Sequence, residues 1–145
     1  MQCSHCGKCC QGTEMELSRK DSDRLEKIGY SREEFSIVGK DDVTRLRNVG
    51  EWCFFYDTSA ERCRVYVDRP LGCCLYPAMY SEDDGVIVID ELCPMSETIS
   101  EEELKAKGRI LIDLLKTIDA EAELRSRSNP KRSARLENSR KRSNR

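Results

Sequence analysis

Four cysteines occur within eight residues in the segment CSHCGKCC, residues 3 to 10, and no other feature constrains the fold of this chain as much. Five further cysteines bring the total to nine, at Cys53, Cys63, Cys73, Cys74 and Cys93. An odd number cannot pair completely, and neighbours such as Cys9 and Cys10 cannot form a disulfide with each other without strain. In a reducing compartment, clustered cysteines more often bind metal. The pattern therefore favours a metal-binding protein.

The length and hydropathy of the chain favour such a compartment. Its 145 residues suit one small domain, and no segment approaches the ~18 consecutive apolar residues that a membrane span needs. Cys3 comes too early for the basic and then apolar pattern of a secretory signal. We therefore expect a cytoplasmic protein without a membrane partner. A disulfide scaffold is the alternative if the chain is exported by another route.

The spacing of the first cysteines bears on which metal is bound. Cys3, Cys6 and Cys9 follow a C-x2-C-x2-C pattern, in which two-residue gaps let a turn direct successive sulfurs toward one centre. Zinc knuckles use a single C-x2-C pair, whereas the bacterial ferredoxin run doubles it and adds a more distant cysteine followed by proline. Cys93-Pro94 is such a dipeptide. The spacing slightly favours an iron–sulfur cluster, such as a 4Fe-4S cluster, and zinc stays open.

Eight of the nine cysteines are candidate ligands. Cys53, Cys63 and Cys73 are about ten residues apart, and Cys93 follows after about twenty more. These cysteines lie at expected strand ends or in loops, where side chains from separate elements can converge. Cys74 is expected to be a packing residue or a spare thiol. His5, the only histidine, stands inside a C-x2-C gap and is expected to face solvent. The predicted metal ligands are Cys3, Cys6, Cys9, Cys10, Cys53, Cys63, Cys73 and Cys93.

Capping patterns predict two helices in the first third of the chain. Ser18 stands three residues before Asp21 and opens a helix that ends near Gly29. The same pattern at residues 31–34 predicts a short second helix just before Phe35. Residues 1–13, which hold the first cysteines, are expected to form a loop.

Short strands are predicted between about Val43 and Asp90. The segments WCFFYD, CRVYVD and GVIVID are rich in β-branched and aromatic residues, and turn residues separate them. We expect three or so antiparallel strands here. The intervening segment DRPLGCCLYP, residues 68–77, contains two prolines and is expected to form a rigid loop rather than a strand.

A long helix is predicted from Ser100, which forms a capping box with Glu103, to about Leu124. Its apolar stripe should pack over the cysteine-bearing part of the chain rather than form a dimer contact. The residues of this stripe are Leu104, Leu111, Leu115 and Ile118, widened by Ile110 and Leu114.

Charge divides the chain into a body and a tail. Residues 125–145 hold nine basic residues and one acidic residue, whereas the first 124 residues hold 16 basic and 26 acidic residues. We expect residues 1–99 to form a cysteine-cluster metal-binding domain, residues 100–124 to form the helix packed on it, and residues 125–145 to be a disordered basic tail. The predicted fold class is α+β, with short antiparallel strands, flanking helices and a long C-terminal helix.

The cysteine-bearing segments resemble a known family. CSHCGKCC, WCFF, CRVYVDRPLGCCLYP and LCP occur here in the order found in the YkgJ-type cysteine-cluster proteins, whose domain is described as zinc- or iron-chelating. The family pattern is CxxCGxCC, then a cysteine, then CxxYxxRPxxCRxYP, then a last cysteine, and the match spans about residues 3–94. Cys74 is a departure, because the family usually has arginine there.

The resemblance implies a metal-chelating domain and adds two residues to the predicted site. Tyr66 and Arg69 match the tyrosine and arginine of the pattern, and the resemblance implies that they interact with the bound cofactor by donating hydrogen bonds toward the sulfurs. Strand packing and a surface charge are the alternative roles. If the arginine that the family usually has at position 74 pairs with the thiolates, Arg69 or the basic tail would supply that positive charge here.

Three functions are open at this point. The first is a metal-binding protein that holds zinc or an iron–sulfur cluster and whose folding depends on the metal. The second is an iron–sulfur-dependent oxidoreductase or electron-transfer protein that uses the cluster or adjacent thiols; the sequence shows no substrate pocket for one. The third is a zinc-stabilised module whose basic tail binds RNA, the ribosome or another acidic partner. The tail lacks aromatic residues for base stacking, so a solvated tail is the simpler interpretation. The oligomeric state is not predicted.

Overall fold

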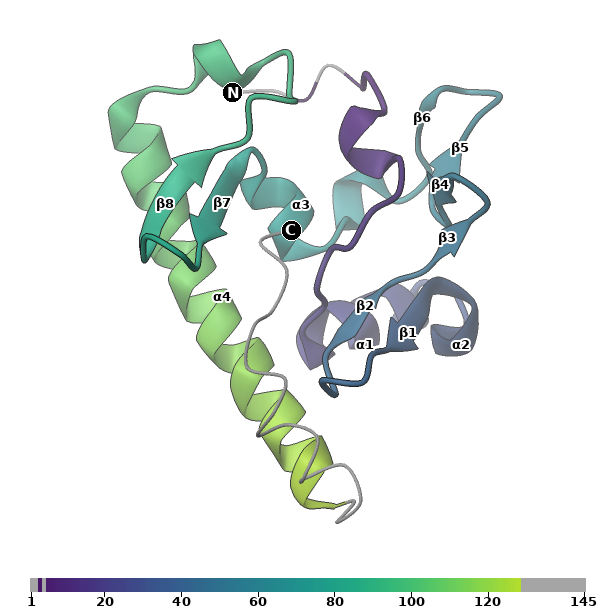
Figure 1. The fold of residues 1–145 in the computed structure, drawn as a ribbon. Coiled ribbons are helices and arrows are strands. Elements are labelled where there is room, and N and C mark those ends of the chain that lie inside the picture. The colour runs from purple at the N-terminus through teal and green to yellow at the C-terminus, as the bar shows by residue number, and fades with distance from the viewer. Residues whose placement is uncertain (1–2, 4, 129–145) are drawn as a thin grey trace.

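The structure is a computed structural model that describes residues 3 and 5–128 (Figure 1). Its helices are α1 (Arg19–Lys27), α2 (Arg32–Phe35), α3 (Leu71–Leu75) and α4 (Glu101–Arg127). Its strands are β1 (Ser36–Val38), β2 (Thr44–Leu46), β3 (Asn48–Val49), β4 (Trp52–Cys53), β5 (Tyr56–Asp57), β6 (Arg62–Cys63), β7 (Ala78–Ser81) and β8 (Val86–Ile89). Short 3-10 helices lie at Lys8–Cys10, Tyr66–Asp68 and Ser96–Thr98. The predicted α+β class is confirmed.

The strands form four separate antiparallel pairs rather than one sheet. β1 pairs with β2, β3 with β4, β5 with β6 and β7 with β8. The predicted antiparallel strands therefore exist, but they are shorter and more numerous than expected. A two-stranded hairpin is marginal alone, so these pairs depend on packing and on what their side chains bind.

Two predictions for the middle of the chain are wrong. In CRVYVD, residues 63–68, only Cys63 belongs to a strand, as the last residue of β6, and Tyr66–Asp68 forms a 3-10 helix. The segment 68–77, predicted as a loop, contains helix α3. Pro70 is the residue that precedes the first turn of α3, and its fixed φ of −53° suits a helix start, where its missing N–H costs nothing.

The capped helices agree with the prediction. Ser18 Oγ accepts a hydrogen bond from the backbone N–H of Asp21 at 3.1 Å, and Ser100 Oγ accepts one from Glu103 at 3.1 Å. The short helix α2 is present, but Ser31 makes no side-chain cap. Helix α4 ends at Arg127, three residues beyond the predicted end. The remainder of the basic tail, residues 129–145, lies outside the described residues.

Two apolar clusters make the core. The first contains Leu17, Leu25, Phe35 and Phe55, and the two phenylalanines are at most 1% exposed. Full burial of each such ring stabilises the fold by roughly 1.5–3 kcal/mol. The second cluster joins α4 to Val43 and α3. Its helix residues recur every three or four positions, namely Leu111, Leu114, Ile118 and Ala122.

The α4 stripe is narrower than predicted, because Ile110 is 47% exposed. In Figure 1, α4 runs along one side of the molecule with the β7–β8 hairpin against its first half, and α1, α2 and the hairpins β1 to β6 form the other side. Helix α3 and the N-terminal 3-10 helix lie between the two sides. This arrangement brings cysteines distant in sequence to one place.

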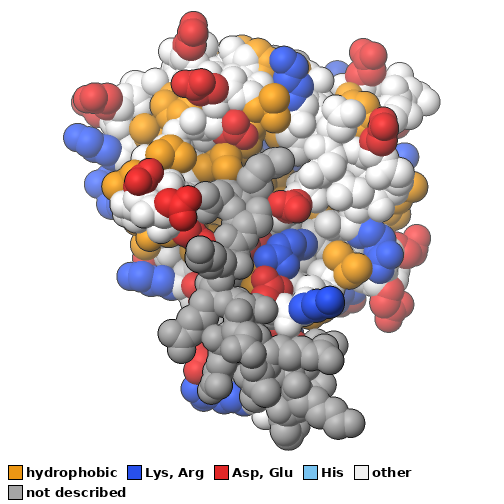
Figure 2. All heavy atoms as spheres, viewed as in Figure 1, with side chains coloured by type: hydrophobic (Ala, Val, Ile, Leu, Met, Phe, Trp, Pro, Cys, Tyr) orange, Lys and Arg blue, Asp and Glu red, His pale blue; other side chains and the backbone are white. Residues whose placement is uncertain are grey.

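The charges visible on one face are mixed. In Figure 2, acidic and basic side chains alternate with apolar ones over the described part of this face. Such a mixture is typical of a solvated surface rather than of a phosphate-binding patch. Among residues 3 and 5–128, no helix is both long enough and apolar enough to cross a bilayer.

Candidate metal centre

All eight predicted cysteine ligands line one cavity of about 80 Å³. The ninth, Cys74, does not. The cavity wall is mostly apolar and is completed by aromatic and basic residues. All nine cysteines lie within the described residues, and none is joined in a disulfide. The cysteines of the wall are Cys3, Cys6, Cys9, Cys10, Cys53, Cys63, Cys73 and Cys93.

The N-terminal cysteines are presented by a tight turn on an aromatic platform. Gly7 has a φ of +79°, and the backbone N–H of Cys10 donates to the Gly7 carbonyl at 3.0 Å. The rings of Trp52 and Tyr56 stack with centroids 4.5 Å apart, and they lie directly beneath Gly7. The expected loop therefore contains a 3-10 turn at Lys8–Cys10, and both of its cysteines line the cavity.

Two hairpins supply the next two cysteines. Cys53 ends β4 and is 7% exposed, and Cys63 ends β6 and pairs across the hairpin with Tyr56. Cys53 belongs to the first apolar cluster, and Cys63 packs against it. Each hairpin is too short to be stable alone, so its position depends on this packing.

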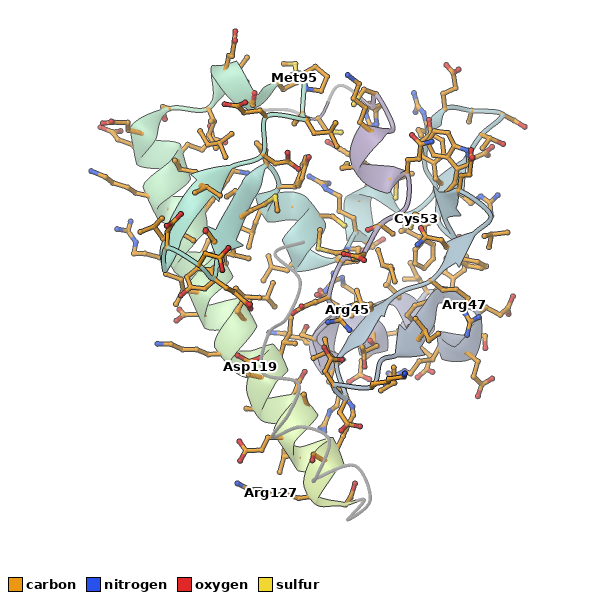
Figure 3. All side chains as sticks on the ribbon, viewed as in Figure 1. Arg45, Arg47, Cys53, Met95, Asp119 and Arg127 are labelled. Atoms are coloured by element: carbon orange, nitrogen blue, oxygen red, sulfur yellow. The ribbon has the colours of Figure 1, made fainter. Side chains whose placement is uncertain are left out.

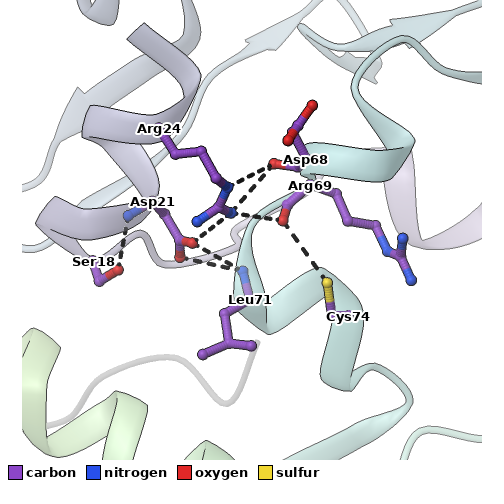
Figure 4. A network of polar contacts seen from close by, with 7 residues as sticks. All are labelled: Ser18, Asp21, Arg24, Asp68, Arg69, Leu71 and Cys74. Carbon is purple, nitrogen blue, oxygen red and sulfur yellow. Dashed lines mark hydrogen bonds and ion pairs between the residues drawn. The ribbon is translucent and has the colours of Figure 1, made fainter. Parts of the chain in front are cut away.

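A polar network fixes the segment that carries Cys73 (Figure 4). Asp21, 2% exposed, accepts hydrogen bonds from the Leu71 backbone N–H at 3.2 Å and from the Arg24 guanidinium at 2.8 Å. Arg24 also donates to the carbonyls of Asp68 and Arg69. Asp21 thereby pairs with a backbone N–H that the start of α3 leaves unpaired, and Arg24 binds two carbonyls of the segment just before the helix.

The last predicted ligand follows β8. Cys93 is 8% exposed, and its backbone N–H donates to the Asp90 carbonyl at 3.3 Å in a turn. The Asp90 carboxylate accepts a hydrogen bond of 2.6 Å from the Tyr76 hydroxyl, which ties this turn to the end of α3. In the view of Figure 3, Met95, two residues after Cys93, and Cys53 lie on different sides of the N-terminal 3-10 helix.

Tyr66 and Arg69, predicted to interact with the cofactor, also line the cavity and contact each other. The Arg69 guanidinium lies 4.0 Å from the centroid of the Tyr66 ring and donates to the Tyr66 carbonyl at 2.6 Å. The prediction for His5 is wrong: it is half-buried in the cavity wall, with its ring 4.6 Å from that of Tyr66. Its φ of 58° lies in the left-handed region.

Five of the eight thiols of the cavity have a raised pKa and so resist ionisation. Burial raises the pKa of Cys53 to about 11, despite backbone hydrogen bonds that oppose the shift. A hydrogen bond with Cys9, followed by burial, raises the pKa of Cys10 far above its usual range. Burial, with Cys53 next in importance, does the same for Cys73. Several thiolates in one small cavity would repel each other, so they need a nearby cation to ionise together. Burial likewise raises the pKa of two further thiols, Cys63 and Cys93.

The donor set fits a thiophilic metal, although the side chains are not yet arranged as ligands. Eight soft sulfur donors around an apolar cavity suit zinc, iron or an iron–sulfur cluster better than a hard cation. Within residues 3 and 5–128, no three histidine, cysteine or carboxylate side chains already form a ready-made metal site.

Cys74 is directed elsewhere, as the sequence predicted for a spare thiol. Its sulfur lies 3.8 Å from the Arg69 carbonyl, outside the cavity wall (Figure 4). Lys107 of α4 donates to the Cys74 carbonyl at 3.0 Å. Sequence reasoning missed Tyr56, Trp52 and Asp21 as supports of the site. Trp52 and Tyr56 carried a signal, because both lie in the cysteine-bearing segment WCFFYD.

Comparison with known proteins gives a family match over most of the chain. Residues 2–94 match the family CxxCxxCC, described as "Putative zinc- or iron-chelating domain". An uncharacterized protein of Methanocaldococcus jannaschii is 33% identical over 95 residues, which are 60% of this chain and 50% of the relative. The chain thus spans about half the length of this curated relative. No solved structure matches the chain.

Proposed function

The chain belongs to the CxxCxxCC family of zinc- or iron-chelating domains, and from this premise we propose that it chelates zinc or an iron–sulfur cluster through the eight cysteines of the cavity. The observation that supports the proposal is the selectivity of the cavity wall. It includes every cysteine except Cys74. Cys73 and Cys74 are neighbours in α3, where consecutive side chains point about 100° apart, and only Cys73 faces the cavity.

The residues of this chain prepare the cavity for a cation. Burial and the charge of neighbouring thiols raise the pKa of Cys53 and Cys73, and a bound cation would supply the positive charge that stabilises their thiolates. Arg69 contributes fixed positive charge, since it lowers the pKa of Cys63, whereas burial, the larger effect, raises it. Tyr66 holds the Arg69 guanidinium against its ring. These two residues would then orient donors and charge toward the sulfurs.

Measurements on one purified sample distinguish an iron–sulfur cluster from a zinc site. The full chain would be purified without oxygen, and its absorbance spectrum, metal content and acid-labile sulfide measured on the same sample. Absorbance near ~400 nm together with iron and sulfide would establish an iron–sulfur protein. A colourless protein with stoichiometric zinc would establish a zinc site. Folded chain with neither metal, even after anaerobic loading, contradicts the proposal.

Two adjacent cysteines make the residue assignment testable. Cys73→Ser should lower the metal content or the affinity for metal by about 10- to 100-fold, because it removes a donor from the cavity. Cys74→Ser removes a thiol from the same helix but leaves the cavity wall intact. Equal metal loss in both variants would indicate a general effect on α3 rather than ligation.

A further inference from the structure

A groove of about 540 Å³ lies beside the metal cavity and shares part of its wall. Small-molecule sites in proteins typically occupy about 300–1,000 Å³, so the groove is large enough for an organic ligand. A molecule bound there would lie against a proposed metal ligand, because Cys63 lines both spaces. The residues common to the two walls are His5, Arg62, Cys63, Val65 and Tyr66.

The floor of the groove is held in place by the core. Val65 is 4% exposed and belongs to the first apolar cluster. The Tyr30 ring packs against this cluster and makes an edge-to-face contact with Phe55, with ring centroids 5.0 Å apart. Tyr66 is held by the guanidinium of Arg69, which lies over its ring. A floor formed in advance lowers the conformational cost of binding a ligand.

Two apolar side chains of the groove wall are exposed. Val67, in the 3-10 helix Tyr66–Asp68, is 90% exposed, and Ile28, just after α1, is 45% exposed. A single exposed apolar residue is common on protein surfaces, but these two line the same groove as the Tyr30 ring. Together the three side chains offer contacts to the apolar or aromatic body of a ligand.

Positive charge enters the same groove from β6 and the residue after it. Arg62 and Arg64 both line the groove, and within residues 3 and 5–128 neither guanidinium forms an ion pair. The Asp57 carboxylate near Arg64 instead accepts hydrogen bonds from two backbone N–H groups of its own turn. The one acidic residue among the described residues of the wall is Asp68. Two arginines against one carboxylate favour an anionic ligand, which a guanidinium can bind through paired N–H donors.

We propose that this groove binds a small organic anion with an apolar or aromatic body. The acidic group of the ligand pairs with Arg62 and Arg64, and its body lies against Tyr30, Ile28 and Val67. That the anion sits next to a metal rests on the proposed function, whereas the binding itself rests on the groove alone. The groove would supply the small-molecule pocket that an enzyme built on this metal centre needs.

The probe is 2-naphthoate, which joins a carboxylate to an aromatic body. The full-length chain, labelled with nitrogen-15 and reduced, would be loaded with Zn²⁺ without oxygen, and its zinc content measured. Naphthoate would then be titrated while the amide NMR spectrum is recorded, since zinc has no unpaired electrons. We expect saturable shifts centred on residues 28–30 and 62–68, with a Kd of about 1 mM or lower. The uncharged 2-naphthamide should bind about tenfold more weakly.

Two variants separate the charge from the apolar contact. Arg64→Gln should weaken naphthoate binding about tenfold and leave naphthamide binding unchanged. Its zinc content should equal that of the wild type, because Arg64 lines the groove but not the metal cavity. Val67→Ser should weaken both compounds about fivefold, because it removes apolar contact area. The matched controls are Arg47→Gln and Val49→Ser, two exposed residues that line neither space.

The groove and the chelation fail in different ways. The groove proposal is overturned if naphthoate at about 1 mM causes no saturable shifts there, or if naphthamide binds equally well. An unchanged affinity in Arg64→Gln overturns it too. In a chain that holds zinc, each of these results leaves chelation standing. A chain that binds naphthoate in the groove but retains neither zinc nor iron supports the groove and contradicts the chelation.

Discussion

At the scale of single residues, Gly7 is the most constrained position of the first cysteine cluster. Its φ of +79° lies in the left-handed region, and an added Cβ would stand 2.7 Å from the Tyr56 hydroxyl oxygen and 3.2 Å from the Trp52 ring. The sequence indicated a relaxed turn at this glycine. It gave no sign of the aromatic platform, because Trp52 and Tyr56 are more than 40 residues away.

Gly7→Ala should therefore loosen the N-terminal ligands. Left-handed backbone and overpacking against the platform together cost about 3 kcal/mol, and we expect lower metal content and a lower thermal midpoint. Gly12→Ala is the matched control, since its φ is +58° but no atom lies within 4 Å of an added Cβ. That variant should lose only about 1 kcal/mol. Equal effects in the two variants would show that the aromatic contact is unimportant.

Asp41 has a stabilising charge in the turn between β1 and β2. Burial would raise its pKa, but hydrogen bonds from Arg45 and from the Val43 backbone outweigh burial and lower it. Arg45 donates to both carboxylate oxygens, at 3.0 and 2.7 Å, and lies 3.6 Å from Glu16. Because the folded pKa is below the unfolded value of about 3.9, this stabilisation is complete above that value and disappears as the pH falls through the folded pKa.

Asp41→Asn should therefore destabilise the protein by about 1 kcal/mol at pH 7 and by much less near pH 3. Free energies of unfolding from denaturant titrations, with both proteins in the same metal state, would measure this difference. A difference that stays constant between the two pH values would mean that the Asp41 charge contributes nothing.

At the scale of elements, α1 positions α3 through side chains rather than through an apolar contact. Asp21 and Arg24 satisfy the backbone at residues 68–71, immediately before Cys73 (Figure 4). Since the network connects residues about 50 apart in sequence, no local pattern predicts it. Ser18 could be predicted as a cap because its partner is three residues away. The strand prediction for CRVYVD was wrong because it rested only on the local residue types. Pro70 and this long-range network favour helical turns there instead.

Asp21→Asn tests this link between the two helices. Removing the charge leaves the Arg24 guanidinium without its carboxylate and weakens the hydrogen bonds to Leu71, at a cost of about 2 kcal/mol. We expect a lower thermal midpoint and weaker retention of metal. Asp23→Asn changes the same helix at an exposed pair with Arg32 and should cost less than about 1 kcal/mol. If Asp23→Asn proves equally damaging, the link to α3 is not the cause.

At the scale of the whole molecule, the cavity joins parts of the chain that are distant in sequence. Its walls come from the N-terminal turn, from the hairpins and α3, and from the turn after β8. The second apolar cluster instead depends on α4 with Leu75 and Val43. The sequence indicated both features, through the cysteine pattern and the period of α4. Cysteine spacing alone could not show which thiols pack on the core, because that depends on where Phe35 and Phe55 place the apolar cluster.

Removal of the metal should therefore affect the two halves unequally. Amide hydrogen exchange would be compared between metal-loaded and metal-free full-length chain under reducing conditions. Without metal, the thiols around residues 5–12, 52–66 and 91–96 lose their common partner, and exchange there should quicken about tenfold or more. Residues 111–122 of α4 should keep their protection, because Leu111, Leu114 and Ile118 are buried against other apolar side chains. Equal loss of protection along α4 would mean that the metal supports the entire fold as one cooperative unit, and reloading with metal should restore the original pattern.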